Sequence, residues 1–238
     1  MKINEFIDYL KEININVTEK ELSLLEKYYE FLVEYNSHTN LTSITQKDLV
    51  YLKHFYDSIS VAQSYDFTKE LKVLDIGTGA GFPGVILKIF FPQIKLVLLD
   101  SNNKKTTFLI NLIKKLDLKN VTVVNDRAEN YIKQNRESFD VVISRAVANM
   151  AILLELGIPF LKVGGNLIAM KASREVTTKE LDNSKNTLQI IKAKIITEKS
   201  FLLPIENSQR TIIVFEKEDI TDTKYPRSYD KILKNPLK

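Results

Sequence analysis

The chain has 238 residues and a formal net charge of +4, from 34 lysines and arginines against 30 aspartates and glutamates. It has no cysteine, which excludes disulfides, thiolate zinc sites and cysteine nucleophiles and fits a reducing compartment. No stretch reaches the length of a membrane span and no apolar leader is present, so we expect a cytoplasmic protein without membrane contact. The weak positive charge permits nucleic-acid binding without demonstrating it.

The first 66 residues predict a helical subdomain. Thr18-Glu19-Lys20-Glu21 has the form of a capping box, and apolar residues follow at helical spacing. The tyrosines in this pattern favour packing over base stacking; the positions are Leu25, Tyr28, Tyr29, Leu32 and Tyr35. The polar stretch Asn36–Asn40 interrupts the period and predicts a connection, after which Asp48–Ala62 predicts another helical segment.

From Leu71 onward, short apolar runs alternate with helical patterns. The predicted strands are Lys72–Ile76, Lys95–Leu99, Val121–Val124, Phe139–Ser144 and Asn166–Met170. The predicted helices between them are Pro83–Phe90, Lys104–Leu116, Arg127–Gln134 and Met150–Leu161. Strands that alternate with helices pair in parallel through right-handed crossovers, so the pattern predicts a doubly wound α/β sheet.

The pattern changes near the end of the chain. After a polar helical stretch, Glu175–Gln189, come two β-rich runs, Ala193–Leu203 and Arg210–Glu216. The segment between these runs is too short for a helical crossover, so they should pair as an antiparallel hairpin. Five parallel strands closed by an antiparallel pair are typical of the class I, Rossmann-like sheet of S-adenosylmethionine-dependent methyltransferases. We therefore predict a methyltransferase domain at 67–217, preceded by the helical subdomain and followed by a tail, 218–238, on or near the substrate side.

Four of the 7 glycines fall between Gly77 and Gly84, where the backbone must turn tightly or approach a ligand. Gly79-Ala80-Gly81-Phe82-Pro83-Gly84 formally matches the dinucleotide fingerprint, which leaves an NAD-dependent oxidoreductase as an alternative. In that fingerprint the first glycine closes directly on the strand, whereas here Gly77 does so. Asp75 ends the strand, which gives the Asp-x-Gly-x-Gly-x-Gly pattern of methyltransferases. A carboxylate there suits a cationic sulfonium better than a diphosphate.

Further chemistry-bearing residues follow the later strands. Asp100 ends the second strand, 19 residues beyond Gly81, where a carboxylate reaches ribose hydroxyls; a helix N-cap is the alternative. The loop Asn125–Glu129 follows the third strand and should frame the adenine. Arg145 follows the fourth strand and is costly to bury unpaired, so it should meet a cofactor carboxylate, a phosphate or a partner acid.

Several short motifs together resemble one family. They are Asp75–Gly84, Asp100–Lys105, Ser144-Arg145-Ala146, Asn40-Leu41-Thr42, His54–Ser58, Met170-Lys171, Leu203-Pro204 with Arg210, and Tyr225-Pro226-Arg227. This combination is similar to the small-subunit ribosomal RNA methyltransferase G family (RsmG, also called GidB) over nearly the whole chain. Two departures stand out: Ala172-Ser173 follows Lys171 where glycine is usual, and the tail reads Ser228-Tyr229-Asp230-Lys231 where a glycine and a proline are usual.

The resemblance implies methyl transfer from S-adenosylmethionine to N7 of a guanosine in the decoding region of 16S rRNA, with S-adenosylhomocysteine as product. It implies the small ribosomal subunit or an assembly intermediate as partner, and we expect a monomer. The implied cofactor contacts, with Gly79 added from the glycine loop, are Gly77, Gly79, Phe82, Asp100, Ala128, Glu129 and Arg145. Arg145 and Lys171 are candidates for orienting cofactor or RNA, and no catalytic base and no metal are expected.

The residues also restrict the acceptor. Without cysteine, covalent attack on a pyrimidine ring is excluded, and the chain has no Asn/Asp-Pro-Pro-aromatic loop for exocyclic amines. Guanine N7 carries a lone pair and no proton, so positioning can supply most of the catalysis. A ribosome-assembly protein that kept the fold without transfer is a further alternative. Candidate RNA contacts are Lys47, Lys53, His54, Lys171, Arg174, Arg210 and Arg227, although a packed, hydrogen-bonded role is favoured for His54.

Overall fold

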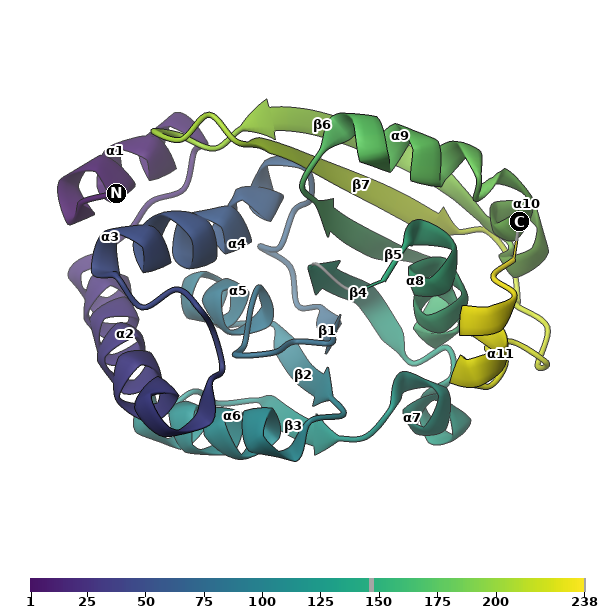
Figure 1. Cartoon of the computed structure of the whole chain (residues 1–238), viewed down its shortest axis with the longest axis horizontal. Helices are drawn as coiled ribbons and strands as arrows, with labels where there is room; N and C mark the ends of the chain where they lie inside the picture. The colour runs from purple at the N-terminus through teal and green to yellow at the C-terminus, as the bar shows by residue number, and fades with distance from the viewer. Residues whose placement is uncertain (146–147, 238) are drawn as a thin grey trace.

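A mixed seven-stranded sheet forms the centre of the computed structural model, which describes residues 1–145 and 148–237 (Figure 1). The strands are β1 (Lys72–Ile76), β2 (Lys95–Asp100), β3 (Val121–Asn125), β4 (Phe139–Arg145), β5 (Leu161–Lys171), β6 (Ala193–Leu202) and β7 (Gln209–Lys217). Their order is β3-β2-β1-β4-β5-β7-β6. The first five strands are parallel, and β7 pairs antiparallel with both β5 and β6. The predicted sheet and its antiparallel hairpin are confirmed.

The fifth strand begins earlier than predicted, at Leu161 in place of Asn166. Its register against β4 shifts, because Phe139 pairs with Leu161 whereas Val141 pairs with Asn166. Residues 162–164 are exposed, and Gly164 adopts a positive φ of 82°. This irregular, exposed stretch has no apolar alternation, so the sequence pattern marked only the regular part of the strand.

Helices cover both faces of the sheet. One face carries α1 (Ile3–Glu12), α2 (Glu19–Thr39), the consecutive segments α3 (Lys47–Val50), η1 (Tyr51–Tyr56), α4 (Asp57–Ile59) and η2 (Ser60–Gln63), then α5 (Gly84–Phe90) and α6 (Asn103–Lys115). The other face carries α7 (Ala128–Asn135), α8 (Met150–Gly157), η3 (Ile158–Phe160), α9 (Arg174–Asp182), α10 (Lys185–Ile191) and α11 (Tyr229–Lys234). Each group packs its own hydrophobic core against the sheet, and α1 and α2 add an outer layer to the first core, on the side of the inner helices that faces away from the sheet (Figure 1).

The N-terminal region is helical, and the capping box at Thr18 is present. The predicted connection at Asn36–Asn40 was wrong, because α2 continues to Thr39. The hydroxyls of Ser37 and Thr39 donate to carbonyl oxygens inside the same helix, at 2.6 and 2.7 Å, so their polarity is satisfied without leaving the helix. Asn40, with φ 52°, ends the helix in the left-handed conformation that asparagine tolerates.

The late polar stretch forms two helices, α9 and α10, separated by a turn at Asn183 and Ser184. The tail then contacts α8, where Arg227 donates three hydrogen bonds to the fully buried carboxylate of Glu155. The tail residues that depart from the family pattern begin α11, with Ser228 as the residue before its first turn. Within residues 1–145 and 148–237, no helix has the length and apolar character needed to cross a membrane.

Candidate functional site

Three adjoining cavities form a trough along the carboxyl ends of the parallel strands. The first, of about 290 Å³, lies between β1, β2, α7, α8 and α11. The second, of about 380 Å³, lies over the glycine loop and shares Gly77 and Asp100 with the first. The third, of about 320 Å³, lies toward β5 and β7 and shares His54 and Arg145 with the second. Ligand crevices of open α/β sheets occupy this edge.

The glycine loop is fastened to the neighbouring strand β2. Gly77 and Gly79 have φ values of 68° and 62°, which residues other than glycine rarely adopt. The Gly77 N–H donates to the Leu99 carbonyl at 2.8 Å, and the Gly79 N–H donates to Asp100 Oδ2 at 2.9 Å. The backbone of the loop therefore lines the second cavity, and its two hydrogen bonds to β2 hold it in place.

Asp75 lies beneath this loop and is fully buried. Its Oδ2 accepts hydrogen bonds from the Thr78 hydroxyl at 2.7 Å and the Gly84 N–H at 2.9 Å. Burial raises its pKa to about 6, opposed by these two hydrogen bonds and by the charge of Arg145. A Cβ at Gly84 would stand 2.7 Å from Asp75 Oδ2, so glycine is needed there. Asp75 lines none of the three cavities, and its hydrogen bonds shape the loop, whereas the sequence analysis related this carboxylate to a cationic cofactor by its charge.

Asp100 lines both the first and the second cavity and is 8% exposed. Its Oδ1 accepts from the Asn102 N–H at 2.9 Å, and its Oδ2 accepts from Gly79. Each carboxylate oxygen has a further lone pair, so two acceptors are available to a pair of ribose hydroxyls. The N-cap of α6 is Asn102, whose Oδ1 accepts from the Lys104 N–H, so the N-cap alternative for Asp100 does not hold.

The first cavity is closed by α7 and by the tail. Ala128 and Glu129 form the first turn of α7, where backbone N–H groups lack partners within the helix. Tyr229 from α11 and Leu156 from α8 complete the lining. Sequence reasoning missed these last two residues, since nothing in the local pattern connects either of them to a loop about 80 to 150 positions earlier.

Phe82 joins the glycine loop to the N-terminal helices. Its ring stacks on His54, with centroids 4.5 Å apart and planes at 16°, and on Tyr28, at 5.3 Å and 12°. Tyr28 is fully buried, as the packing prediction for the tyrosines requires, and its hydroxyl donates to the Ala80 carbonyl. The Arg145 guanidinium lies 5.1 Å from the Phe82 ring centroid. The N-terminal helices thus form one wall of the second cavity.

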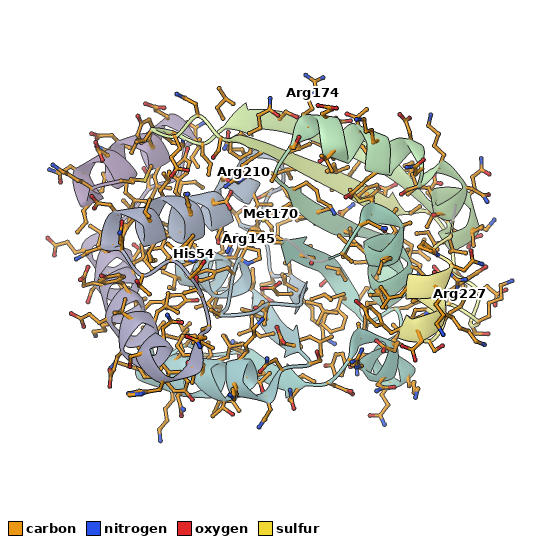
Figure 2. The ribbon with its side chains drawn as sticks, viewed as in Figure 1. His54, Arg145, Met170, Arg174, Arg210 and Arg227 are labelled. Carbon is orange, nitrogen blue, oxygen red and sulfur yellow. The ribbon has the colours of Figure 1, made fainter. Side chains whose placement is uncertain are left out.

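Arg145 finds a partner acid, Asp57 of α4. The Arg145 Nη1 donates to Asp57 Oδ2 at 3.0 Å and to the Lys53 carbonyl at 2.9 Å. The other carboxylate oxygen of Asp57, Oδ1, accepts from Arg210 Nε at 2.8 Å. One carboxylate, buried to 8% exposure, therefore pairs with two arginines, from β4 and β7, and leaves one positive charge in excess. Figure 2 shows His54, Arg145, Met170 and Arg210 gathered near the centre of the molecule.

His54 is packed and hydrogen-bonded, as the sequence favoured. Its Nε2 pairs with the Thr42 hydroxyl at 3.0 Å, and its Nδ1 lies 3.4 Å from Arg145 Nη2. Burial and, secondarily, the charge of Arg145 lower its pKa from 6.5 to about 4. The imidazole is therefore neutral at neutral pH.

Most of the other expected basic residues have acidic partners. Lys171 pairs with Glu180 at 2.9 Å and donates to the Ala148 carbonyl at 2.8 Å. The remaining pairs are Lys47–Glu26, Lys53–Glu206 and Arg227–Glu155. Arg174 is exposed and points outward from the start of α9, while Arg227 lies far from the Arg145 cluster (Figure 2). Ala146, part of the Ser144–Ala146 motif, lies outside the described residues.

We predict that Asp57→Asn lowers the free energy of unfolding by about 2–4 kcal/mol, because it leaves two largely buried arginines without a compensating charge. Glu206→Gln is the matched control, since its pair with Lys53 is about one third exposed and should contribute about 0–1 kcal/mol. Urea unfolding of the two variants measures the difference. Equal effects would show that Asp57 does not hold the cluster together.

We predict that the His54 imidazole titrates with a midpoint near 4. The chain has 2 histidines, so His38→Gln leaves His54 as the single imidazole signal in an NMR titration. The folded pKa lies below the unfolded value of 6.5, so the contribution of His54 to stability is complete above pH 6.5 and is lost as the pH falls toward 4. Adding Arg145→Leu should raise the midpoint. A midpoint at or above 6 in the parent variant contradicts the buried, neutral imidazole.

Known proteins are similar to this chain in sequence, in fold or in both. A family model described as rRNA small subunit methyltransferase G matches residues 21–208. Proteins named ribosomal RNA small subunit methyltransferase G from Geobacillus sp. and Oceanobacillus iheyensis are 45% and 44% identical over 239 residues, covering 100% of each chain.

Solved structures share the sheet at lower identity. An S-adenosylmethionine-dependent methyltransferase from Aquifex aeolicus is 20% identical with a TM-score of 0.54, over 70% of this chain and 93% of that one. M. jannaschii TYW2, crystallised with AdoMet, is 17% identical with a TM-score of 0.54, over 68% and 76% of the two chains. These likenesses show the fold, and the full-length relatives and the family model show the family. The chain belongs to the rRNA small subunit methyltransferase G family.

Proposed function

We propose that this protein transfers a methyl group from S-adenosylmethionine to N7 of a guanosine in the 16S rRNA of the small ribosomal subunit. The relatives named ribosomal RNA small subunit methyltransferase G match the chain over its full length. The observation that carries the proposal is the trough in which the glycine loop and Asp100 adjoin a cavity lined by two arginines. We assign the decoding region as target on the family resemblance.

The residues present fit S-adenosylmethionine. The first cavity offers Asp100 to ribose hydroxyls and the first turn of α7, at Ala128 and Glu129, to the adenine. The second cavity offers the backbone of Gly77 and Gly79 and the ring of Phe82 to the amino-acid end. The sharing of Gly77 and Asp100 by both cavities fits one elongated ligand. When bound, S-adenosylmethionine supplies an electrophilic methyl group on a sulfonium.

The chain contributes orientation rather than proton transfer. Guanine N7 carries no proton, so no general base is needed. His54, the titratable ring of the second cavity, is held neutral and engaged by Thr42 and Phe82. Arg145 reaches both the second and the third cavity while bound to Asp57, which fixes its guanidinium where the two cavities meet. Lys171 lines the third cavity from β5 and is oriented by Glu180.

The third cavity is the side on which we place the RNA. Its lining carries four cations, Arg145, Arg210, Lys53 and Lys171. Three carboxylates, Asp57, Glu206 and Glu180, pair with them, so one positive charge remains in excess and favours a phosphate. Met170 adds an apolar surface suited to a base. In this assignment residues 67–217 carry the transfer, residues 1–66 and 218–238 flank it, and the protein acts as a cytoplasmic monomer on the small subunit or an assembly intermediate.

We predict that 16S rRNA from a strain lacking this protein loses one N7-methylguanosine. Mass mapping of the rRNA from the deletion strain and its parent measures the loss, and re-expression of the wild-type chain should restore it. An unchanged methylation pattern would exclude this activity and leave an assembly factor without transfer as the better account. Calorimetry with S-adenosylmethionine and with NAD tests the cofactor, and binding of NAD alone would overturn the proposal.

We predict that Asp100→Asn weakens S-adenosylmethionine binding about 10- to 100-fold, because hydrogen bonds to a charged acceptor contribute about 1.5–3 kcal/mol. Asp117→Asn is the control, since Asp117 lies in an exposed ion pair with Lys119 after α6. Isothermal calorimetry gives both dissociation constants. Unchanged affinity in the Asp100 variant would remove this carboxylate from the ribose site.

A further inference from the structure

We propose that Tyr229 of α11 is a cofactor-positioning residue, whose ring closes the adenine end of the trough. The inference rests on the proposed function, since it assigns a role in holding S-adenosylmethionine. Tyr229 lines the first cavity together with Asp100 and the first turn of α7. The ring is half-buried, so part of its surface is available to a ligand.

The position of Tyr229 is fixed from both ends of α11. Before the helix, Arg227 donates through its backbone N–H and Nε to Glu155 Oε1 at 3.0 and 2.8 Å, and through Nη2 to Oε2 at 2.6 Å. Glu155 is fully buried, so this contact anchors the tail to α8 inside the protein. Within the helix, Ile232 is fully buried. Beyond it, the Thr187 hydroxyl donates to the Leu237 carbonyl at 2.7 Å. The tail is therefore docked at three points around Tyr229.

A second contact comes from Arg127, which directly precedes α7 and also lines the first cavity. The Arg127 guanidinium lies 5.4 Å from the centroid of the Tyr229 ring. The same guanidinium is 3.9 Å from Glu129, which also lines the cavity. Arg127 therefore links the tail to the loop that frames the adenine. A flat aromatic ring beside a cavity of this size provides a surface on which a purine can stack.

Stacking on one aromatic side chain changes nucleobase affinity by roughly 5- to 150-fold. In the full-length protein, Tyr229→Leu should therefore raise the dissociation constant for S-adenosylhomocysteine by about this factor. Leucine keeps an apolar side chain and the helix while it removes the aromatic face. Tyr229→Phe, which keeps the ring, should bind within about twofold of the wild type. Leu233→Ala is the control on the same helix, because Leu233 is 49% exposed and lies outside the cavity.

A second measurement reports proximity rather than affinity. The chain has no tryptophan, so Tyr229→Trp creates a protein with one indole at this wall. Its emission should shift or quench when S-adenosylhomocysteine saturates the protein. Leu233→Trp, also a single-indole protein, should show no change. A merely structural role for Tyr229 predicts lower thermal stability in the leucine variant without an emission change in the tryptophan variant.

The outcomes separate the two proposals. If the wild type binds S-adenosylhomocysteine, weakened binding by Tyr229→Leu together with the emission change at position 229 supports the inference. If the wild type binds and Tyr229→Leu binds equally well, or the indole at 229 does not respond, the inference fails and the proposed function stands. If the wild type binds neither S-adenosylmethionine nor S-adenosylhomocysteine, the proposed function fails and the inference fails with it.

Discussion

The carboxylate of Asp57 joins three parts of the molecule that the chain supplies far apart. It sits on the N-terminal helical segment and divides its two oxygens between Arg145, at the end of the fourth parallel strand, and Arg210, on the antiparallel strand β7. Two arginines on neighbouring structural parts would repel each other in a partly buried site. Asp57 lies between them, so its two ion pairs join the N-terminal helices to the parallel sheet and to its antiparallel extension. The positions of His54 and Phe82 follow, because both stack against this cluster.

Asp75 contributes to the same site by fixing the conformation of the glycine loop. Its buried carboxylate accepts from Thr78 and Gly84 and so closes the glycine loop on itself, while Gly79 ties the loop to Asp100. Oδ1 of Asp75 has no hydrogen-bond partner among the residues that the structure describes, and burial raises the pKa of the carboxyl despite the two hydrogen bonds to Oδ2. A carboxylate that is costly to bury is retained where it organises backbone amides into one conformation. Because Asp75 accepts hydrogen bonds from the Thr78 hydroxyl and the Gly84 N–H, the loop keeps one conformation, in which the backbone of Gly77 and Gly79 lines the second cavity.

The local pattern of apolar residues is sufficient to predict most of the strands of the sheet. The buried strands β1, β2 and β4 form continuous apolar runs, and the edge strand β3 is rich in valine, so the bounds of all four are predicted to within one residue. The short separation of the last two strands predicts their antiparallel pairing. Local pattern failed where polar side chains bond within a helix, as at Ser37 and Thr39, and where a strand is exposed and irregular, as before Asn166. The local pattern predicts Asp100 and Arg145 as site residues because each ends a parallel strand, and the carboxyl ends of parallel strands lie at one edge of the sheet. It could not identify Asp57, Leu156 or Tyr229 as members of the site, since only tertiary packing brings them there.

The trough draws its walls from nearly the whole length of the chain, from Leu41 and Thr42 to Arg210 and Tyr229. When Asp100 is added to the growing chain, more than half of the 238 residues have still to be translated. Until β7 follows, Asp57 lacks one of its two arginines, and until the tail follows, the first cavity lacks a wall. Assembly of the complete trough is thus a late event in translation, and a chain truncated before the tail would leave an open crevice.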